Sequence, residues 1–234
     1  EGGREHEVDV GLPCSYPDAP PEVRMDLPAA VVLRWGPGGS LQGVIAQCAS
    51  AAARYQGLWE VLEDLDEHAW VLEPERPLRS STFRRVALGG HVSLSLEVDP
   101  SAPRGMPEWR LVGAAGAIAP LQARLLEGRA QWSPHRLLRG NLEVVLGRAL
   151  PARATLPVED VSGDCGICYS YRLPGGAIPE RVCDNERCGR PFHHECLCGW
   201  LHSISSAKQV FTTVFGSCPY CAQEITAQVT GAAA

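Results

Sequence analysis

CGICYSYRLPGGAIPERVCDNERCGRPFHHEC, residues 165–196, holds five cysteines and two adjacent histidines, and a further pair follows in CPYC at residues 218–221. Of the ten cysteines in this 234-residue chain, only Cys14 and Cys48 lie before residue 164. Paired Cys-x-x-Cys units with an interposed histidine are typical of metal sites rather than of a disulfide framework. The sequence therefore predicts a domain boundary followed by a metal-binding module.

Eight residues of this region are candidate metal ligands, and zinc takes four thiolate or imidazole ligands in a structural site. We therefore expect two structural zinc ions, which can divide the ligands sequentially or in an interleaved manner. The interleaved division assigns the first zinc to Cys165, Cys168, His193 and Cys196, and the second to Cys183, Cys188, Cys218 and Cys221.

His194 and Cys198 lie next to these ligands but are not expected to bind the metal. His193 is favoured over His194, because the spacing His193-x-x-Cys196 repeats that of a Cys-x-x-Cys turn. Cys198 lies too close to Cys196 to serve the same ion comfortably, so we expect an exposed or half-buried thiol there.

The rest of the composition excludes several functions. The formal net charge is −6 with no basic run, so direct binding of nucleic acid has no support. The longest weakly polar run, residues 111–121, is far shorter than the ~20 residues that span a bilayer, and we expect no secretion signal or membrane anchor. Outside the ligands, no Ser/His/Asp or Cys/His pair has the spacing of a nucleophilic site, so we expect no catalytic residue on this chain.

The N-terminal part of the chain reads as α+β. A Trp-x-Pro unit occurs twice, at Trp35 and at Trp132, and each copy is followed by apolar residues at the same three offsets. These residues are Leu41, Ile45 and Cys48 in the first copy and Leu138, Leu142 and Val145 in the second. This repeat predicts two copies of one strand-then-helix unit. The first apolar series continues to Leu62 and predicts one helix of about 25 residues with Cys48 in the core. Period-two apolar residues on both sides of Gly89-Gly90 predict a β-hairpin.

Eight interleaved ligands resemble both the RING domains of ubiquitin ligases and the PHD fingers that read histone tails. In RING domains the positions of Ile167, Trp200 and Pro219 form a shallow apolar groove that docks a ubiquitin-conjugating enzyme, with Tyr169 as a rim contact. The alternative is that Trp200 and Ile167 only cover the metal core and that Pro219 only shapes a turn. PHD fingers usually carry an aromatic residue two places before the seventh ligand, where this chain has Gly216.

A more particular resemblance covers nearly the whole chain. The cysteine-rich region, together with CLCGWL, FGSCPYC, PARATLPVED and residues 58–100, is similar to the Fanconi anaemia group L ubiquitin ligases. The resemblance implies an α+β fold with a tandem RWD-like (ubiquitin-conjugating-enzyme-like) substrate-binding region at 1–156. Its first lobe is expected to be truncated at the start, with an amino-terminal domain missing. A two-zinc cross-brace RING domain at 157–227 and a flexible tail at 228–234 complete the expected organisation.

The same resemblance implies a RING-type E3 ubiquitin transferase that forms no covalent intermediate with ubiquitin. Its expected partners are a ubiquitin-conjugating enzyme of the T type, the Fanconi anaemia DNA-clamp pair as the substrate for monoubiquitination in DNA crosslink repair, and other core-complex subunits. The implied location is the nucleus, and also the cytoplasm. The YPDAPP turn at residues 16–21 resembles that of RWD domains, yet neither lobe offers a cysteine where a conjugating enzyme has its nucleophile.

The sequence does not identify the substrate-binding residues, which stay unknown. Trp109, Leu121 and Trp132 fit two interpretations, exposed anchors or core residues. Many RING ligases have an arginine or lysine directly after the final zinc ligand, where this chain has Ala222. The alternative function is a non-catalytic zinc-stabilised scaffold or a PHD-like histone reader.

Overall fold

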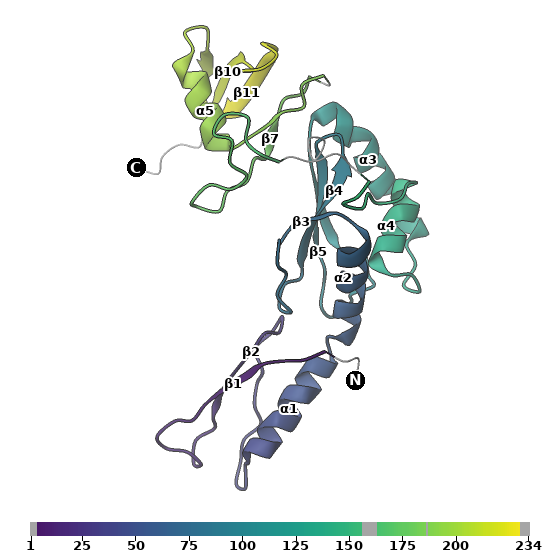
Figure 1. Cartoon of the computed structure of the whole chain (residues 1–234), viewed down its shortest axis with the longest axis vertical. Helices are drawn as coiled ribbons and strands as arrows, with labels where there is room; N and C mark the ends of the chain where they lie inside the picture. The colour runs from purple at the N-terminus through teal and green to yellow at the C-terminus, as the bar shows by residue number, and fades with distance from the viewer. Residues whose placement is uncertain (1–3, 156–162, 186, 230–234) are drawn as a thin grey trace.

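The computed structural model describes residues 4–155, 163–185 and 187–229. It comprises an N-terminal lobe (residues 4–55), a central lobe (56–155) and a cysteine-rich C-terminal module (163–229), with the central lobe between the other two (Figure 1). The predicted boundary near 156 and most of the predicted tail, residues 230–234, lie outside the described residues. No helix in the described part of the chain is both long enough and apolar enough to cross a membrane.

In the N-terminal lobe, β1 (Val8–Gly11) pairs antiparallel with β2 (Glu22–Met25), and α1 (Leu41–Ala53) follows. Ser40 caps α1, because its Oγ accepts a hydrogen bond from the Gly43 N–H at 3.2 Å. The Arg34 N–H donates to Gln47 Oε1 at 2.7 Å, which ties the extended segment before α1 to one face of that helix.

The prediction of one long helix is wrong. The helical residues divide into α1 and α2 (Gln56–His68), with an interruption at Arg54 and Tyr55. The expected apolar stripe is also wrong at its start, since Leu41 and Ile45 are exposed. Only one face of α1 is covered, and that face presents Val44 and Cys48, so the prediction that Cys48 belongs to the core is confirmed.

The central lobe contains a four-stranded antiparallel meander in the order β3-β4-β5-β6. Its strands are β3 (Val71–Glu73), β4 (Phe83–Gly89), β5 (Val92–Glu97) and β6 (Glu108–Val112). Gly89, the last residue of β4, and Gly90, which follows it, have φ of 79° and 59° at the turn into β5, which confirms the predicted hairpin. The left-handed backbone there suits glycine because it has no Cβ to clash.

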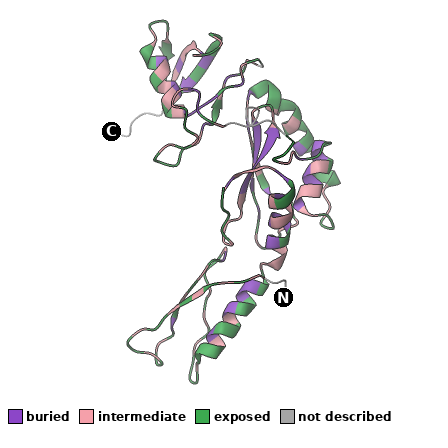
Figure 2. Ribbon diagram, in the orientation of Figure 1, coloured by how far each residue is buried: buried purple, intermediate pink, exposed green. Residues whose placement is uncertain are grey.

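Helices α2, α3 (Ala115–Glu127) and α4 (Leu138–Leu146) lie along one side of this sheet, with the short 3₁₀ helix η1 (Gly128–Gln131) between α3 and α4 (Figure 1). Leucines on α2 and α4 are fully buried and join the inward side chains of β4 and β5 in one core. The purple stripes in Figure 2 show this core. Trp109, Leu121 and Trp132 are partly buried against it.

The predicted repeat is right about helices and wrong about strands. Helix α1 begins at Leu41 and α4 at Leu138, the same number of residues after Trp35 and Trp132. However, Trp35 follows an irregular segment and Trp132 follows η1, so neither described copy has the expected strand before its helix. Leu138 in the second copy is buried because α4 packs on α2, whereas α1 reaches that core only at its C-terminal end, through Ala51 and Ala52.

The C-terminal module has its own small core around Phe192, Leu197 and Leu201. Its elements are β7 (Arg181–Val182), β8 (Pro191–Phe192), α5 (His194–Ser203), β9 (Lys208–Val210), β10 (Thr213–Ser217) and β11 (Glu224–Gln228). The predicted start of the flexible tail at residue 228 is too early. Gln228 still pairs with Thr213 in the sheet, and the Val229 N–H donates to the Thr212 carbonyl.

Candidate metal centres and the surface beside them

The structure collects the eight candidate ligands into two groups of four, divided in the interleaved way. The first group is Cys165, Cys168, His193 and Cys196, and the second is Cys183, Cys188, Cys218 and Cys221. Within each group the donor atoms all lie within 4.8 Å of one another. A sequential division would place Cys183 and Cys188 with the first pair, which the fold does not do.

Short loops and one helix end present these ligands. The first Cys-x-x-Cys loop is closed by the Tyr169 N–H, which donates to the Cys165 carbonyl at 2.8 Å, and the last is closed by the Ala222 N–H, which donates to the Cys218 carbonyl at 3.1 Å. His193 is the N-cap residue of α5, and Cys196 lies in the first turn of that helix. The helix therefore fixes the His-x-x-Cys unit as a rigid pair.

The donor separations suit a tetrahedral ion of the size of zinc. A tetrahedron with Zn–S bonds of ~2.3 Å has sulfur atoms about 3.8 Å apart. The Sγ atoms of Cys183 and Cys221 are 3.6 Å apart, and those of Cys188 and Cys218 are 3.9 Å apart. These distances are far longer than a disulfide bond of ~2.04 Å. In the first centre, His193 Nδ1 lies 3.3 Å from Cys168 Sγ and 3.8 Å from Cys196 Sγ.

His193 has the partner that a metal-bound histidine needs. Its side chain is fully buried, and Nδ1 faces the cysteines. The opposite ring nitrogen, Nε2, donates to the Tyr171 carbonyl at 3.3 Å. A bond of this kind fixes the ring orientation and leaves Nδ1 free to bind the ion. The adjacent His194 belongs to neither ligand group. The structure therefore agrees with the choice of His193 over His194 that the spacing to Cys196 favoured.

Burial and hydrogen bonding shift the pKa values of several of these thiols. Burial raises the pKa of Cys196 to about 12 and also raises that of Cys183. Burial acts to raise the pKa of Cys221, but hydrogen bonds from the Gln223 N–H and from the side chains of Cys183, Asn185 and Cys218 together lower that pKa to about 7. Since a metal binds the thiolate form, loading at neutral pH must release protons from the more basic thiols.

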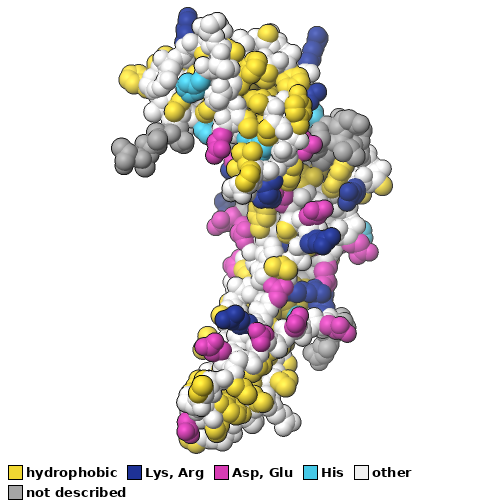
Figure 3. All heavy atoms as spheres, turned by 60° about the vertical axis from the view of Figure 1, so that its left-hand side comes forward, with side chains coloured by type: hydrophobic (Ala, Val, Ile, Leu, Met, Phe, Trp, Pro, Cys, Tyr) yellow, Lys and Arg dark blue, Asp and Glu magenta, His cyan; other side chains and the backbone are white. Residues whose placement is uncertain are grey.

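The predicted groove residues lie around the first and last Cys-x-x-Cys loops. The Tyr220 hydroxyl donates to the Gly166 carbonyl at 2.6 Å, and this bond joins the loop of Ile167 to the loop of Pro219. The Trp200 indole N–H donates to the Ser217 carbonyl at 2.9 Å, beside that second loop. These two bonds bring the loops of Ile167 and Pro219 close to Trp200. Figure 3 shows apolar side chains among those on the visible face of the module.

These groove residues differ in exposure. Ile167, Trp200 and Pro219 are half-buried, with Ile167 and Trp200 packed against the module's core. Tyr169 is 74% exposed at the rim. Trp200 therefore both covers part of the core and presents a free edge, so the two interpretations of this residue do not exclude each other.

Three further positions bear on the site. Cys198 is half-buried, and its Sγ lies 3.7 Å from His194 Nε2, outside both ligand groups. A Cβ at Gly216 would lie 2.7 Å from Leu201 Cδ2, so the aromatic residue of a PHD finger would have to displace Leu201. Ala222 has φ of 58° directly after the last ligand.

Sequence reasoning missed Tyr220, which links the two loops and is covered by the Arg190 guanidinium at 4.2 Å from the ring centroid. Its place inside CPYC, between two ligands, was a signal that could have found it.

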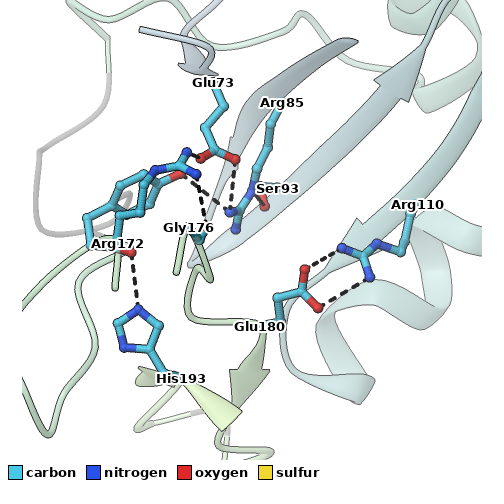
Figure 4. Close-up of polar contacts among 9 residues, drawn as sticks. Glu73, Arg85, Ser93, Arg110, Arg172, Gly176, Glu180 and His193 are labelled. Atoms are coloured by element: carbon cyan, nitrogen blue, oxygen red, sulfur yellow. Dashed lines mark hydrogen bonds and ion pairs between the residues drawn. The ribbon is translucent and has the colours of Figure 1, made fainter. Parts of the chain in front are cut away.

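Sequence reasoning also missed the contacts between the module and the central lobe (Figure 4). Arg172 is paired with Glu73, and Glu180 with Arg110. No spacing rule could have revealed these pairs, whose members are far apart in the sequence.

Comparisons with known proteins agree with this architecture. Three consecutive family models match, namely FANCL UBC-like domain 2 at residues 1–55, FANCL UBC-like domain 3 at 57–153 and the FANCL C-terminal domain at 161–230. A solved structure described as the crystal structure of FANCL is 25% identical, with a TM-score of 0.59 over 79% of this chain and 53% of that chain.

Two curated relatives are similar along much of the chain. The E3 ubiquitin-protein ligase FANCL of Mus musculus is 43% identical over 229 residues, which are 98% of this chain and 61% of the mouse protein. The E3 ubiquitin-protein ligase Fancl of Drosophila melanogaster is 29% identical over 166 residues, 68% of this chain and 44% of the fly protein. The chain thus spans less than two thirds of the length of these relatives.

Proposed function

We propose that this chain, which belongs to the FANCL family, acts as a RING-type E3 ubiquitin ligase. In this proposal the C-terminal module recruits a ubiquitin-conjugating enzyme that carries ubiquitin, and the UBC-like lobes hold the protein substrate. The observation that carries it is the joining of the first and last Cys-x-x-Cys loops by Tyr220, which brings the surroundings of Ile167 and Pro219 together next to Trp200.

The two centres would each hold one zinc ion, which fixes the loops and has no open position for a substrate. This chain's own residues then supply the docking surface. Half-buried aromatic and aliphatic side chains are typical anchors of protein interfaces, because they bury a large area at a small cost in side-chain entropy. Ile167, Trp200 and Pro219 have that character, and Tyr169 adds an exposed ring at the edge.

The mechanism needs no nucleophile on this chain. Ubiquitin would pass directly from the conjugating enzyme's cysteine to a lysine of the substrate, and the ligase would raise the rate by holding the two proteins in a productive orientation. Cys48, the cysteine within the helix of the N-terminal lobe, is 2% exposed and therefore closed to such chemistry. The lobes would use the UBC-like fold as a binding surface.

The family relationship also suggests the biological setting. We infer a conjugating enzyme of the T type and the Fanconi anaemia DNA-clamp pair as the substrate for monoubiquitination in crosslink repair. The other core-complex subunits would be further partners, and the nucleus, with the cytoplasm, would be the location. The support for this setting is the similarity to ligases that carry the FANCL name.

A discharge assay tests the proposed activity. The purified, zinc-loaded chain is added to a panel of conjugating enzymes charged with ubiquitin, and the loss of thioester to free lysine is followed. We expect at least one enzyme of the panel, the T-type enzyme among them, to discharge faster. If no member of the panel responds and the chain instead binds a methylated histone-tail peptide, the ligase proposal fails and the PHD-like alternative replaces it.

A further inference from the structure

The central lobe and the C-terminal module have separate apolar cores. In the described part of the chain, every buried member of the first core lies at or before Leu150, and every buried member of the second lies at or after Cys165. A cleft of about 680 Å³ opens between β6 and α3 on one side and the module on the other. The two cores are therefore not continuous, although apolar side chains of both bodies, such as Val92 of the lobe and Val182 of the module, line a small space where the bodies meet.

An ion pair with a buried carboxylate also joins the two bodies (Figure 4). The Glu73 side chain, at the end of β3, is 9% exposed and accepts a hydrogen bond from Arg172 of the module. Arg85 of β4, whose side chain is 5% exposed, lies 3.9 Å from the same carboxylate, and its Nη1 is 3.5 Å from the Tyr171 hydroxyl. Burial raises the pKa of Tyr171 to about 12, so this hydroxyl stays neutral.

This cluster is continuous with the first metal centre. The Tyr171 carbonyl accepts the hydrogen bond from His193 Nε2, and Arg172 donates through Nη1 to the Gly176 carbonyl at 2.9 Å. The segment that contacts the lobe is therefore held firmly within the module. Movement at the Glu73 contact would be passed on to the module as a whole, because metal-bound loops are rigid.

Two more contacts lie at other points of the same interface. The Arg110 guanidinium of β6 donates two hydrogen bonds to the Glu180 carboxylate, at 2.5 and 3.3 Å. The Ala115 N–H, in the first turn of α3, donates to Asp184 Oδ1 at 2.9 Å. The N-cap residue of α3, Ala114, offers no side-chain acceptor, so a carboxylate from the module takes the place of a helix cap.

We propose that Glu73 and Arg172 are positioning residues, which fix the orientation of the C-terminal module on the central lobe and thereby place the conjugating enzyme over the substrate. This inference rests on the proposed ligase function. Contacts from β3, β6 and α3 hold the module at three separate places, and three such points define an orientation. The Glu73 contact is expected to contribute most, because the Glu73 side chain is 9% exposed, whereas the side chains of Arg110 and Glu180 are 60% and 42% exposed and exposed pairs contribute little.

The orientation can be measured as the distance between two spin labels, by pulsed electron spin resonance on the full 234-residue chain. Spin labels are attached through noncanonical amino acids at the exposed positions Leu126 of α3 and Val210 of β9, because the native cysteines are needed for the metal. We expect one narrow distance distribution in the parent chain and a clearly broader one in Arg172→Gln. Arg172→Lys, which keeps the charge, is expected to fall between them.

A matched control uses an ion pair that lies within the central lobe. Glu60 of α2 pairs with Arg104 at 2.9 Å, away from the module, so Glu60→Gln should leave the distribution narrow. Zinc content and the thermal transition are measured for each variant. Arg172→Gln is the main test because the Arg172 side chain is half exposed, which makes this change milder for folding than Glu73→Gln.

The consequence for activity separates this inference from the proposed function. Discharge to free lysine needs only the module, so Arg172→Gln should stay within about twofold of the parent. Transfer to the folded substrate should fall by about tenfold or more, since small misplacements of reacting groups have large effects on rate. An unchanged distance distribution, or equal losses in both assays, would overturn the positioning role, whereas failure of the parent chain to discharge any conjugating enzyme would instead refute the ligase activity.

Discussion

At the scale of single residues, Trp200 combines two roles in one side chain, since its N–H is bonded to the Ser217 carbonyl and its ring packs on the module's core. We expect Trp200→Ala to weaken binding of the conjugating enzyme by at least about 2 kcal/mol, as for an aromatic hot spot. Isothermal calorimetry measures this, and zinc content should be unchanged.

Comparison variants separate docking from folding at this position. Ile167→Ala should weaken binding in the same way but more mildly, whereas Trp200→Phe keeps a smaller aromatic ring and loses the N–H that donates to the Ser217 carbonyl. Wild-type affinity in the Trp200→Ala variant would show that the groove is elsewhere on the module.

Ala222, directly after the last metal ligand, is expected to influence the rate of ubiquitin discharge. Many RING ligases have a cation at this position, where its hydrogen bonds can hold conjugating enzyme and ubiquitin together. Ala222→Arg should therefore raise discharge to free lysine without changing affinity for the uncharged conjugating enzyme. The backbone already has φ of 58° with alanine, so arginine adds little further strain there. An unchanged discharge rate at saturating ligase would mean that the missing cation does not limit this enzyme.

At the scale of elements, the close packing of η1 against α4 depends on one glycine. Gly128 is buried with ordinary right-handed backbone, yet an added Cβ would lie 2.4 Å from Val145 Cγ1. Gly128→Ala should lower the free energy of unfolding by about 1–3 kcal/mol, because the core must shift to admit the methyl group. Denaturant unfolding of the central lobe measures this loss.

Gly140, inside α4, provides the matched control. A Cβ there meets no heavy atom within 4 Å, and the backbone is helical. Gly140→Ala should therefore stabilise the lobe by roughly 0.5–1 kcal/mol through helix propensity. Equal effects at the two glycines would contradict the packing argument.

At the scale of the whole molecule, the two separate cores predict that the parts unfold independently. Chelation of zinc should unfold the C-terminal module and leave the central lobe intact, because metal binding and folding are coupled in small metal domains. Proteolysis after chelation should leave a stable fragment that ends near residue 155. Elemental analysis should find two zinc ions per chain, and Cys183→Ala should abolish folding of the module. A folded module with one ion or none would contradict this prediction.

The sequence alone was sufficient where chemistry depends on local spacing. Cys-x-x-Cys pairs and the His193-x-x-Cys196 unit indicate ligands whatever the fold, because a tight turn or one helical turn presents both donors to one ion. The Gly89-Gly90 hairpin was equally predictable, since few residues take a left-handed backbone without strain. The helical character of residues 41–62 and of the segment after Trp132 was predictable from apolar spacing. The interruption at Tyr55 was not, because the apolar series continues through it.

Only the tertiary structure decided the relations between distant segments. It brought His193 to Cys168, which separates the interleaved division of ligands from the sequential one. It also placed Arg172 against Glu73 and left Leu41 exposed. The physical reason is the same in each case: burial and ion pairing depend on which surfaces meet, and spacing within one segment carries no information about the segment that will cover it.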